Sequence, residues 1–562
     1  MEKTHLEKSV EGDYPISAIA RWEWFAWAIL LIWLIASRVW YAPDVLYEWD
    51  SANYALGLRE FNIFEHQPHP PGNPLLMMLL WMAQPFGAGP PQFLVVNALL
   101  GGGVLLLLGW MTRPLVGPVS AFVVAVAFAF CPPFWYQGAV STAYIAECFT
   151  LAACGAVSLA LIRGKLSLPI GALFAALALG LRPSAVPAVV LIIIYGIAFS
   201  EPKLRPFILS GVVFILTCLT WTIPMLFTGG GLPAYRKASG ALWEWQIELG
   251  SILGDGSIVY DNTTLITRYL LDGVNVLWLA IIINAIIAAA RWRLPLRTLA
   301  FVTVWVLPGA LLYALHHLAK SAYVLTLMPA CYVLFILLVG AANHELKGWP
   351  KRVVGGLNVL LFAMYLALNG LAFFTAIPAS LLKYDDAPVE LPDPMIMTGD
   401  YGRLALEYRT WPHRRTTEIM DALHDGGDLA LFLFGTHELM RLQMAASPEQ
   451  WMVASSADHG IAFDTQGIAS PQSFGEYQTQ VLLRPELGLS LDQVTKLDLD
   501  SGRLRISRLG RIIEFEGDRV PRRLIVFTQC PPCRVETGAR FEEIRTFRVS
   551  SSIIAIELSI VE

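Results

Sequence analysis

Long apolar runs recur along the first two thirds of the chain and stop near residue 380. A run of about 20 residues, folded as an α-helix, crosses the roughly 30 Å hydrocarbon layer of a bilayer. Beyond Lys383, charged and turn-forming residues return at the density of a soluble protein. The pattern predicts a cytoplasmic tail at 1–21, a polytopic α-helical membrane domain over 22–380 and a separate domain over 384–562.

Eleven membrane spans are expected from the apolar runs and the charges between them. Lys and Arg cluster in alternate connections, which the positive-inside rule assigns to the cytoplasm. That assignment requires the short apolar piece at 74–86 not to cross, and at about 13 residues it is too short to do so. The N-terminus would then be cytoplasmic and the C-terminal domain extracytoplasmic. The expected spans are 22–42, 91–110, 115–131, 138–162, 166–181, 184–199, 206–227, 273–291, 297–315, 321–340 and 353–378.

Composition agrees with a membrane protein and argues against nucleic acid as a partner. Hydrophobic residues make up 55% of the chain and charged residues only 15%. The net charge is −5, and no basic block is present of the kind that nucleic acid binding requires. Cys530 and Cys533, in "QCPPCR", form a lone CxxC pair. A local disulfide is expected there rather than a zinc site.

The loop after the first span, 43–90, opens with a carboxylate that has two interpretations. The stretch 51–61 reads as a short amphipathic helix lying on the membrane surface, with Asp50 or Ser51 as its cap. Capping alone would account for Asp50. Alternatively, reduced solvation at the membrane boundary would raise the pKa of Asp50 and suit it to act as a base toward a hydroxyl.

The same loop continues with "HQPHPPGNP", in which four prolines restrict the backbone around His66 and His69. A stiff loop that presents two histidines suits a binding surface, although Pro and Gly can also simply end one helix and begin another. Glu65, His66 and His69 can in addition be metal ligands, although their spacing matches no closed structural site. A divalent ion is therefore left open as a cofactor.

Further polar residues are expected on the same outer face of the membrane. Glu147 lies one to two turns inside the fourth expected span, where an ionisable side chain is a functional hypothesis by default. Arg182 ends the fifth span and can either snorkel to the interface or bind phosphate. His317 and Lys320 share one face if their turn is helical, and Tyr323 follows them.

The long outside loop at 228–272 carries Trp243 and Trp245 on either side of Glu244. Tryptophans at a membrane edge usually form an aromatic belt. Beside a carboxylate they can also stack on a sugar ring, so contact with an acceptor is the second interpretation.

The stretch "WDSANYALGLREFNIFEHQPHPPGNPLL" resembles the first external loop of the GT-C superfamily of membrane glycosyltransferases. The resemblance is to the branch of protein O-mannosyltransferases and lipid A aminoarabinose transferases, and "LRPS" and "HHLAKSAY" extend it over about 20–340. It implies an enzyme that moves a sugar from a polyprenyl-phosphate donor to a hydroxyl of a glycan, lipid or protein acceptor. The reaction would take place at the outer face of a membrane, expected to be the bacterial inner membrane.

The resemblance also implies roles for individual residues. One carboxylate suffices for a single in-line displacement with inversion, and a lipid-phosphate leaving group needs only charge stabilisation. Many relatives carry a paired Asp-Glu where this chain has Glu48, Trp49 and Asp50, which leaves a shared role for Glu48 open. The implied catalytic residues are Asp50 and Glu147; the donor-phosphate residues are His69, Arg182, His317, Lys320 and Tyr323; the candidate acceptor or sugar contacts are Glu48, Glu65, His66, Trp243 and Trp245.

The C-terminal region, 384–562, alternates strand-like and helix-like stretches and predicts a small α/β domain outside the membrane. Two other function classes remain as alternatives. A transporter or flippase for a lipid-linked anion would also use an intramembrane Glu147 and nearby cations, but the sequence contains no internal repeat. A non-catalytic envelope scaffold would leave the histidine and proline loop unexplained.

Overall fold

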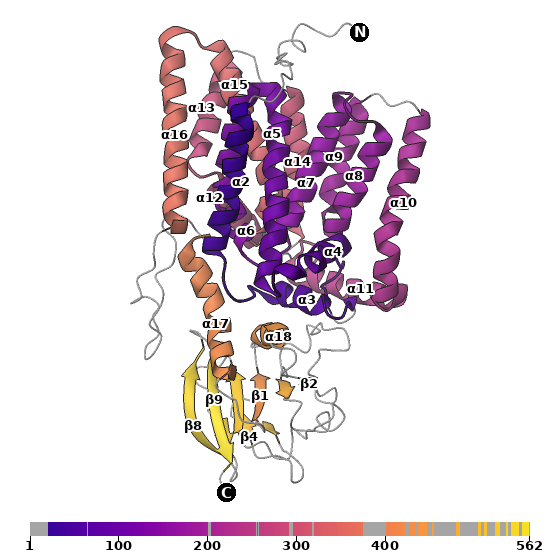
Figure 1. The fold of residues 1–562 in the computed structure, drawn as a ribbon, viewed down its shortest axis with the longest axis vertical. Coiled ribbons are helices and arrows are strands. Elements are labelled where there is room, and N and C mark those ends of the chain that lie inside the picture. Colours follow the sequence, from indigo (N-terminus) through magenta and orange to yellow (C-terminus); the bar gives the residue numbers. More distant parts are fainter. Residues whose placement is uncertain are drawn as a thin grey trace.

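The structure is a computed structural model in which a bundle of long helices occupies one end and a sheet-containing domain the other (Figure 1). The chain is an integral membrane protein with multiple apolar helices. The structure describes residues 21–63, 66–200, 204–254, 256, 258–290, 296–316, 320–374, 401–421, 428–433, 437–446, 452–454, 479–483, 504–506, 511–513, 523–528, 535–537, 541–549 and 553–560.

The bundle is made of α-helices joined by short connections, with 3-10 turns in several of them. Its elements are α2 (Arg21–Tyr41), α3 (Trp49–Gly57), α4 (Pro74–Met82), η2 (Gln84–Phe86), α5 (Pro90–Ala129), α6 (Pro132–Ala139), α7 (Tyr144–Ile162), α8 (Leu168–Leu181), η3 (Pro183–Ala185), α9 (Val186–Phe199), α10 (Leu204–Thr228), α11 (Gly231–Gly250), α12 (Val259–Val274), α13 (Leu277–Ala290), α14 (Leu296–Leu315), η4 (Tyr323–Thr326), α15 (Met328–Glu345) and α16 (Gly348–Phe374).

The 40 residues of α5 form two arms that reverse at Gly117, whose φ of 83° and ψ of 169° are not helical. Both arms pack on the same part of α2. A Cβ on Gly102 would lie 3.2 Å from Leu31, and the ring of Phe130 stacks on Trp33 with centroids 4.3 Å apart. In one straight helix Gly102 and Phe130 would be roughly 40 Å apart. The two arms therefore correspond to the expected spans 91–110 and 115–131.

The structure has fewer candidate membrane spans than the sequence predicts. Within the described residues, six helices are long and apolar enough to cross a membrane, or up to eight if each of two bent helix pairs counts as one span. Eleven spans were expected. The difference from eight arises because α5 is counted as one helix, because α8 and α9 form one bent pair, and because the apolar part of α14, Leu299–Leu315, is too short to be counted. The total falls to six when the bent pairs α8–α9 and α12–α13 are left out. The fourth expected span, 138–162, begins later than expected, since α7 starts at Tyr144.

The apolar piece at 74–86 does not cross the bundle, as the sequence predicts. It forms α4, of nine residues, followed by the turn η2. Nine helical residues extend only about 14 Å, less than half of the hydrocarbon layer. Leu76 and Leu80 are buried against the bundle, while Trp81 and Phe86 are exposed. In Figure 1, α4 lies beside α3 at the end of the bundle that faces α18.

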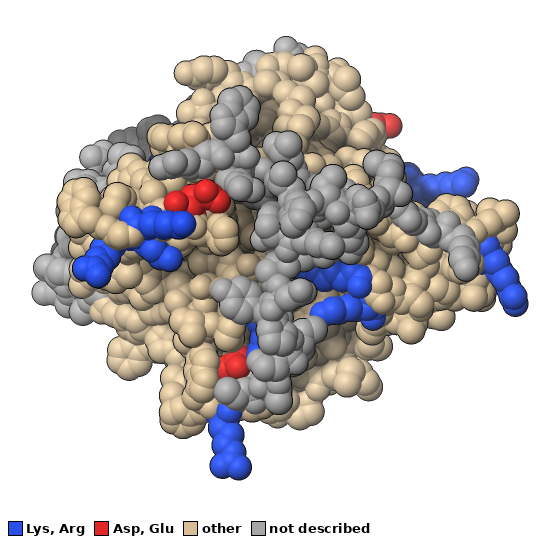
Figure 2. Space-filling view, turned by 90° about the horizontal axis from the view of Figure 1, so that it is seen from above, with Lys and Arg blue, Asp and Glu red and all other residues tan. Residues whose placement is uncertain are grey.

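Basic side chains gather at the opposite end of the bundle, shown in Figure 2 as blue Lys and Arg groups. The α7–α8 connection carries exposed Lys165, and the α15–α16 connection and the first turn of α16 carry exposed Lys347, Lys351 and Arg352. Arg113, near the turn of α5, forms an ion pair of 2.9 Å with Glu23. The charges used to assign the cytoplasmic side thus lie away from α3, α4 and α18.

The C-terminal region contains helices and strands, as the sequence predicts for an α/β domain. Its six-stranded sheet has the order β2-β3-β1-β6-β9-β8, in which β1 and β6 are parallel and the other pairs are antiparallel; a three-stranded sheet has the order β5-β4-β7. The elements are α17 (Arg403–Asp421), β1 (Asp428–Leu433), α18 (His437–Ala446), β2 (Met452–Ala454), β3 (Thr479–Leu483), β4 (Leu504–Ile506), β5 (Arg511–Ile513), β6 (Arg523–Thr528), β7 (Val535–Thr537), β8 (Phe541–Arg548) and β9 (Ile554–Ile560). Cys530 and Cys533 lie outside the described residues.

Candidate active site

The short helix α3 presents Asp50 in its first turn. Its N-cap residue is Glu48, not Asp50 or Ser51 as the sequence suggested. Ser51 nevertheless secures this end of the helix, because its Oγ accepts hydrogen bonds from the backbone N–H groups of Glu48 at 2.7 Å and Tyr47 at 3.1 Å. Capping therefore does not account for Asp50.

The expectation that α3 rests on the membrane surface is wrong. Tyr54 and Leu56 are buried, and both belong to the hydrophobic core shared with the membrane helices. The last residue of α3, Gly57, meets the proline loop closely. A Cβ on Gly57 would lie 2.7 Å from the backbone nitrogen of Pro68, so only glycine permits this approach. The helix is thus enclosed by protein on more than one side.

The electrostatic environment of Asp50 differs from that expected for an isolated carboxylate at a membrane boundary. Burial by itself raises the pKa of Asp50, as the sequence analysis anticipated. The positive charges of His69 when protonated, of Lys320 and of Arg182 outweigh burial, and the pKa of Asp50 falls below its usual value. Asp50 is therefore ionised at neutral pH and can accept a proton.

A buried network connects three membrane helices to α3. Arg182 donates through Nη1 to the hydroxyl of Tyr54 at 3.1 Å, and its Nε lies 3.3 Å from Oε2 of Glu147. Tyr313 donates to the other oxygen of Glu147 at 3.0 Å. The Nδ2 group of Asn73 also bonds Tyr54. The network joins the ends of α7, α8 and α14 that lie nearest to α3 to the helix that carries Asp50.

Local sequence explains why Arg182 and Glu147 can meet. Pro183 disfavours a helical conformation for the residue before it, so α8 ends at Leu181 and Arg182 is extended, with φ of −147° and ψ of 83°. The following segment turns by 120°. Glu147 lies in the first turn of α7, closer to the helix end than the one to two turns expected.

Lys320 and Glu48 form a second cation and carboxylate pair at the site. Lys320 Nζ lies 3.7 Å from Glu48 Oε2, and the Lys320 side chain is 47% exposed. The Glu48 carboxylate raises the pKa of Lys320 above its usual value. Burial, with Asp50 nearby, raises the pKa of Glu48 to about 7 although Lys320 opposes that shift. Glu48 and Asp50 thus belong to one site with different proton affinities.

The histidines of the proline loop contact each other, with His66 Nδ1 and His69 Nδ1 2.8 Å apart. Burial, assisted by the charge of His69, lowers the pKa of His66 to about 2, and burial also lowers the pKa of His69. His66 and Asn73 both have left-handed backbone conformations, with φ of 57° and 43°. Such strained residues are uncommon and concentrate at functional sites.

The remaining candidates are placed as follows. Tyr323 is buried and stacks on Tyr313, with ring centroids 4.8 Å apart, so it belongs to the same network. Trp243 lies on α11, where its ring is 4.4 Å from that of His316. Glu65, His317 and the side chain of Trp245 are outside the described residues. The expected sharing of a helical face by His317 and Lys320 is therefore untested.

A metal site has no support from the part of the chain that the structure describes. No three His, Cys, Asp or Glu side chains within it are close enough together to hold an ion. Glu65, which the sequence proposes as a possible ligand beside His66 and His69, is outside that part.

Several site residues were not identified from sequence. Tyr54, Asn73 and Tyr313 link the charged groups through hydrogen bonds. The two tyrosines gave no signal, because a tyrosine in apolar surroundings is an ordinary core residue. Arg441, on α18, donates from Nε to Asn53 Oδ1 at 2.9 Å. Among these residues, Asn73 could have been noticed in the sequence. It lies between Gly72 and Pro74, and Asn tolerates the left-handed conformation that it adopts there.

No protein-family model and no curated protein sequence matches this chain. This chain is similar to solved structures at low sequence identity. ArnT from Cupriavidus metallidurans bound to undecaprenyl phosphate is 14% identical, with 96% of this chain and 98% of that chain covered and a TM-score of 0.46. Its apo state is 13% identical, with 95% and 97% covered and a TM-score of 0.46. The oligosaccharyltransferase from Archaeoglobus fulgidus in the apo form is 12% identical, with 72% and 59% covered and a TM-score of 0.43.

With identities of 12 to 14% and TM-scores below 0.5, these similarities carry no argument about the function of this chain or the roles of its residues.

Proposed function

We propose that the protein is a membrane glycosyltransferase that moves a sugar from a polyprenyl-phosphate donor to an acceptor hydroxyl. The observation that carries the proposal is the position of Asp50, an ionised carboxylate flanked by the cations Arg182 and Lys320. An acceptor hydroxyl must lose a proton, whereas a phosphate leaving group needs only charge stabilisation. A base beside two cations meets both requirements.

Asp50 is proposed as the general base. Its lowered pKa keeps Asp50 ionised over the physiological pH range, so its carboxylate is available to accept the proton of the acceptor hydroxyl. The proton moves from the acceptor oxygen to Asp50 as that oxygen bonds to the anomeric carbon. The bond from that carbon to the phosphate oxygen breaks on the opposite face, which inverts the anomeric configuration.

Arg182 and Lys320 are proposed to stabilise the phosphate that leaves. Arg182 is held by Glu147 and Tyr54, and a guanidinium has five N–H donors, so donors remain for phosphate oxygens. Glu147 accordingly acts by orienting Arg182 rather than by reacting. Neutral His69 would contribute a hydrogen bond and not a positive charge, because burial lowers its pKa.

The proposed reaction side is extracytoplasmic, since the basic residues of the α7–α8 and α15–α16 connections lie at the other end of the bundle. The number of spans that fits this orientation is eleven, with α8 and α9 crossing separately and α5 crossing twice. The C-terminal domain then lies on the same side as Asp50.

The test replaces Asp50 with Asn, which preserves size and removes the base. Transfer of sugar from a polyprenyl-phosphate donor to envelope acceptors is expected to fall by at least about 100-fold, the contribution of a general base. The donor should still bind, measured as thermal stabilisation by a polyprenyl phosphate. Turnover near that of the wild type, in a variant that folds and reaches the membrane, would refute the role of Asp50.

A further inference from the structure

The helix α18 of the C-terminal domain packs directly against α3, which carries Asp50 (Figure 1). Arg441 and Asn53 are 388 residues apart in sequence but share a hydrogen bond of 2.9 Å. Arg441 is 8% exposed and Asn53 is fully buried. A charged hydrogen bond shielded from water in this way is stronger and more directional than one at the surface.

Arg441 also holds the residue before Asp50. Its guanidinium carbon lies 5.5 Å from the centre of the Trp49 ring, which is cation–π range. One turn earlier on α18, Glu438 accepts a hydrogen bond from the backbone N–H of Trp49 at 3.2 Å. Contacts from one helix of the C-terminal domain therefore reach the positions immediately before Asp50 and one turn after it.

The other contacts of α3 come from the membrane domain. Tyr54, one turn after Asp50, bonds Arg182 and Asn73. A helix of nine residues has little stability of its own, so its orientation is decided by what it packs against. Asp50 thus stands on a helix fixed by the membrane network through Tyr54 and by the C-terminal domain through Asn53.

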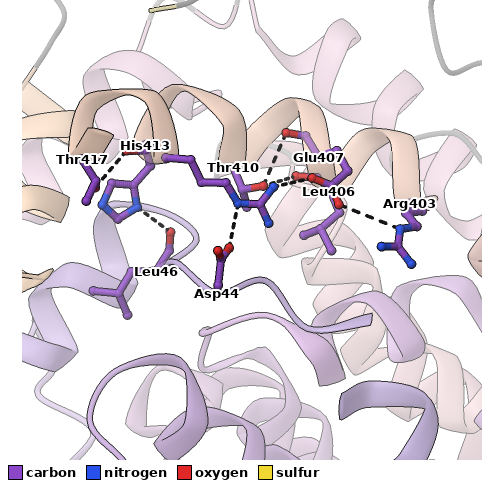
Figure 3. Close-up of polar contacts among 9 residues, drawn as sticks. Asp44, Leu46, Arg403, Leu406, Glu407, Thr410, His413 and Thr417 are labelled. Carbon is purple, nitrogen blue, oxygen red and sulfur yellow. Dashed lines mark hydrogen bonds and ion pairs between the residues drawn. The ribbon is translucent and has the colours of Figure 1, made fainter. Parts of the chain in front are cut away.

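The C-terminal domain is itself attached firmly enough to act as a support. Figure 3 shows α17 above the segment before α3: Arg414 pairs with Asp44 at 2.7 Å, and His413 Nδ1 lies 3.1 Å from the carbonyl oxygen of Leu46. Thr417 of α17 donates to Gln443 of α18 at 3.1 Å. The helices α17 and α18 therefore connect the segment before α3 with the side of α3 that contacts α18.

We propose that Arg441 is a positioning residue for the transfer reaction, through which the C-terminal domain sets the orientation of Asp50. Arg441 acts through Asn53 and Trp49 and need not touch the reacting atoms. The inference rests on the proposed function for its kinetic consequences, but the contact between α18 and α3 exists independently of the chemistry.

The experiment compares Arg441→Met with Arg441→Lys and with Arg415→Ala as a matched control. Arg415 is on α17 in the same domain and pairs with the exposed Glu418, three residues further along the same helix. In Arg441→Met, kcat is expected to fall 10- to 100-fold while the KM for the donor changes less than threefold. Arg441→Lys should recover part of kcat, and Arg415→Ala should match the wild type.

A pH profile separates positioning from an electrostatic effect on Asp50. The charged groups that act most on Asp50 are His69, Lys320, Arg182 and His66. Arg441→Met leaves all four in place, so kcat should fall by a similar factor across the pH range and recover in Arg441→Lys. Adding Asn53→Ala to Arg441→Met should cost little further, because both changes break the same hydrogen bond. An unchanged kcat, a shift of the acid limb without a fall in the maximal kcat, or a loss confined to KM would overturn the inference.

Hydrogen–deuterium exchange of residues 49–57 provides a measurement that needs no substrate. Exchange should become faster in Arg441→Met and remain unchanged in Arg415→Ala. Faster exchange together with an active Asp50→Asn variant would refute the proposed function but leave the support of α3 by α18 intact. Unchanged exchange, with Asp50 still essential, would refute the positioning role alone.

Discussion

Two cation and carboxylate pairs flank Asp50, and they differ in their surroundings. The Arg182–Glu147 pair is buried, with side-chain exposures of 14% and 5%, and Tyr54 and Tyr313 complete its hydrogen bonds. In the Lys320–Glu48 pair, the Lys320 side chain is 47% exposed, and its Nζ lies 3.7 Å from Oε2 of Glu48. The Arg182–Glu147 pair is a fixed part of the structure. In the second pair, Lys320 can exchange Glu48 for another anion.

The difference matters because a phosphate must displace something to reach a cation. Separating a buried pair leaves an unpaired charge in a low-dielectric environment, which costs several kcal/mol. An exposed pair contributes at most about 1 kcal/mol and can be replaced by water or a ligand. We therefore expect the donor phosphate to replace Glu48 as the partner of Lys320. At Arg182 we expect the phosphate to form additional contacts while the pair with Glu147 remains intact.

The largest effect is expected from breaking the buried pair. Glu147→Gln or Arg182→Met should destabilise the protein by about 3 to 5 kcal/mol, because each leaves its partner charged and unpaired. The double variant should recover part of that loss, since no unpaired charge remains. Unfolding of the purified protein in detergent measures both. Single variants with the free energy of unfolding of the wild type would contradict the assignment of Arg182–Glu147 as a structural pair.

A smaller effect on stability, with a clear effect on activity, is expected from Lys320→Met. The free energy of unfolding should change by less than about 1 kcal/mol, because Lys320 is 47% exposed and Glu48, with its pKa raised to about 7, can take up a proton when its partner is lost. The KM for the donor should rise about 10- to 100-fold, which corresponds to the loss of one hydrogen bond to a charged group. Lys320→Arg serves as the control that keeps the charge. A loss of stability comparable to that of Glu147→Gln would remove the distinction between the pairs.

The smallest effect is expected from Glu48→Gln and depends on pH. Because the pKa of Glu48 is raised to about 7, the folded protein binds this proton more tightly than the unfolded chain does. The stabilisation from that proton is complete below the unfolded pKa and disappears as pH rises through about 7. Wild-type melting temperature should therefore fall relative to Glu48→Gln between pH 5 and pH 8.

Glu48→Gln should also bind donor a few times more tightly than the wild type at pH 8, where ionised Glu48 competes for Lys320. At pH 6 the two proteins should be alike. Equal affinities at both pH values would show that Lys320 does not exchange between Glu48 and phosphate. The comparison can be made by titrating a polyprenyl phosphate and following thermal stabilisation.

The helices of the membrane domain could be anticipated because the bilayer imposes a length and an apolar composition on each span. A break between two spans was expected at 111–114, and the structure has it at Gly117, just inside the expected span 115–131. The pairing of Arg182 with Glu147 was not expected, although both residues were selected and assigned to one face. Side chains meet only when the rotation of each helix is known, and an apolar run does not determine that rotation.

Interactions between distant segments account for the other differences. Tyr54 was expected at the membrane surface because its helix reads as amphipathic, but Arg182 and Asn73 supply the polar partners that allow its burial. The raised pKa expected for Asp50 considered burial and not the surrounding cations. Arg441 was missed altogether, since nothing near it in sequence indicates a contact with Asn53.

The two arms of α5 have a consequence for how the protein is made. Trp27 of α2 contacts Phe122 on the second arm, and a Cβ on Gly109 of the first arm would lie 2.5 Å from the same ring. A chain inserted from its N-terminus can therefore complete the packing around Trp27 only when both arms, residues 90–129, have been synthesised. Truncations that end before the second arm should yield an inserted α2 that is docked on the first arm alone.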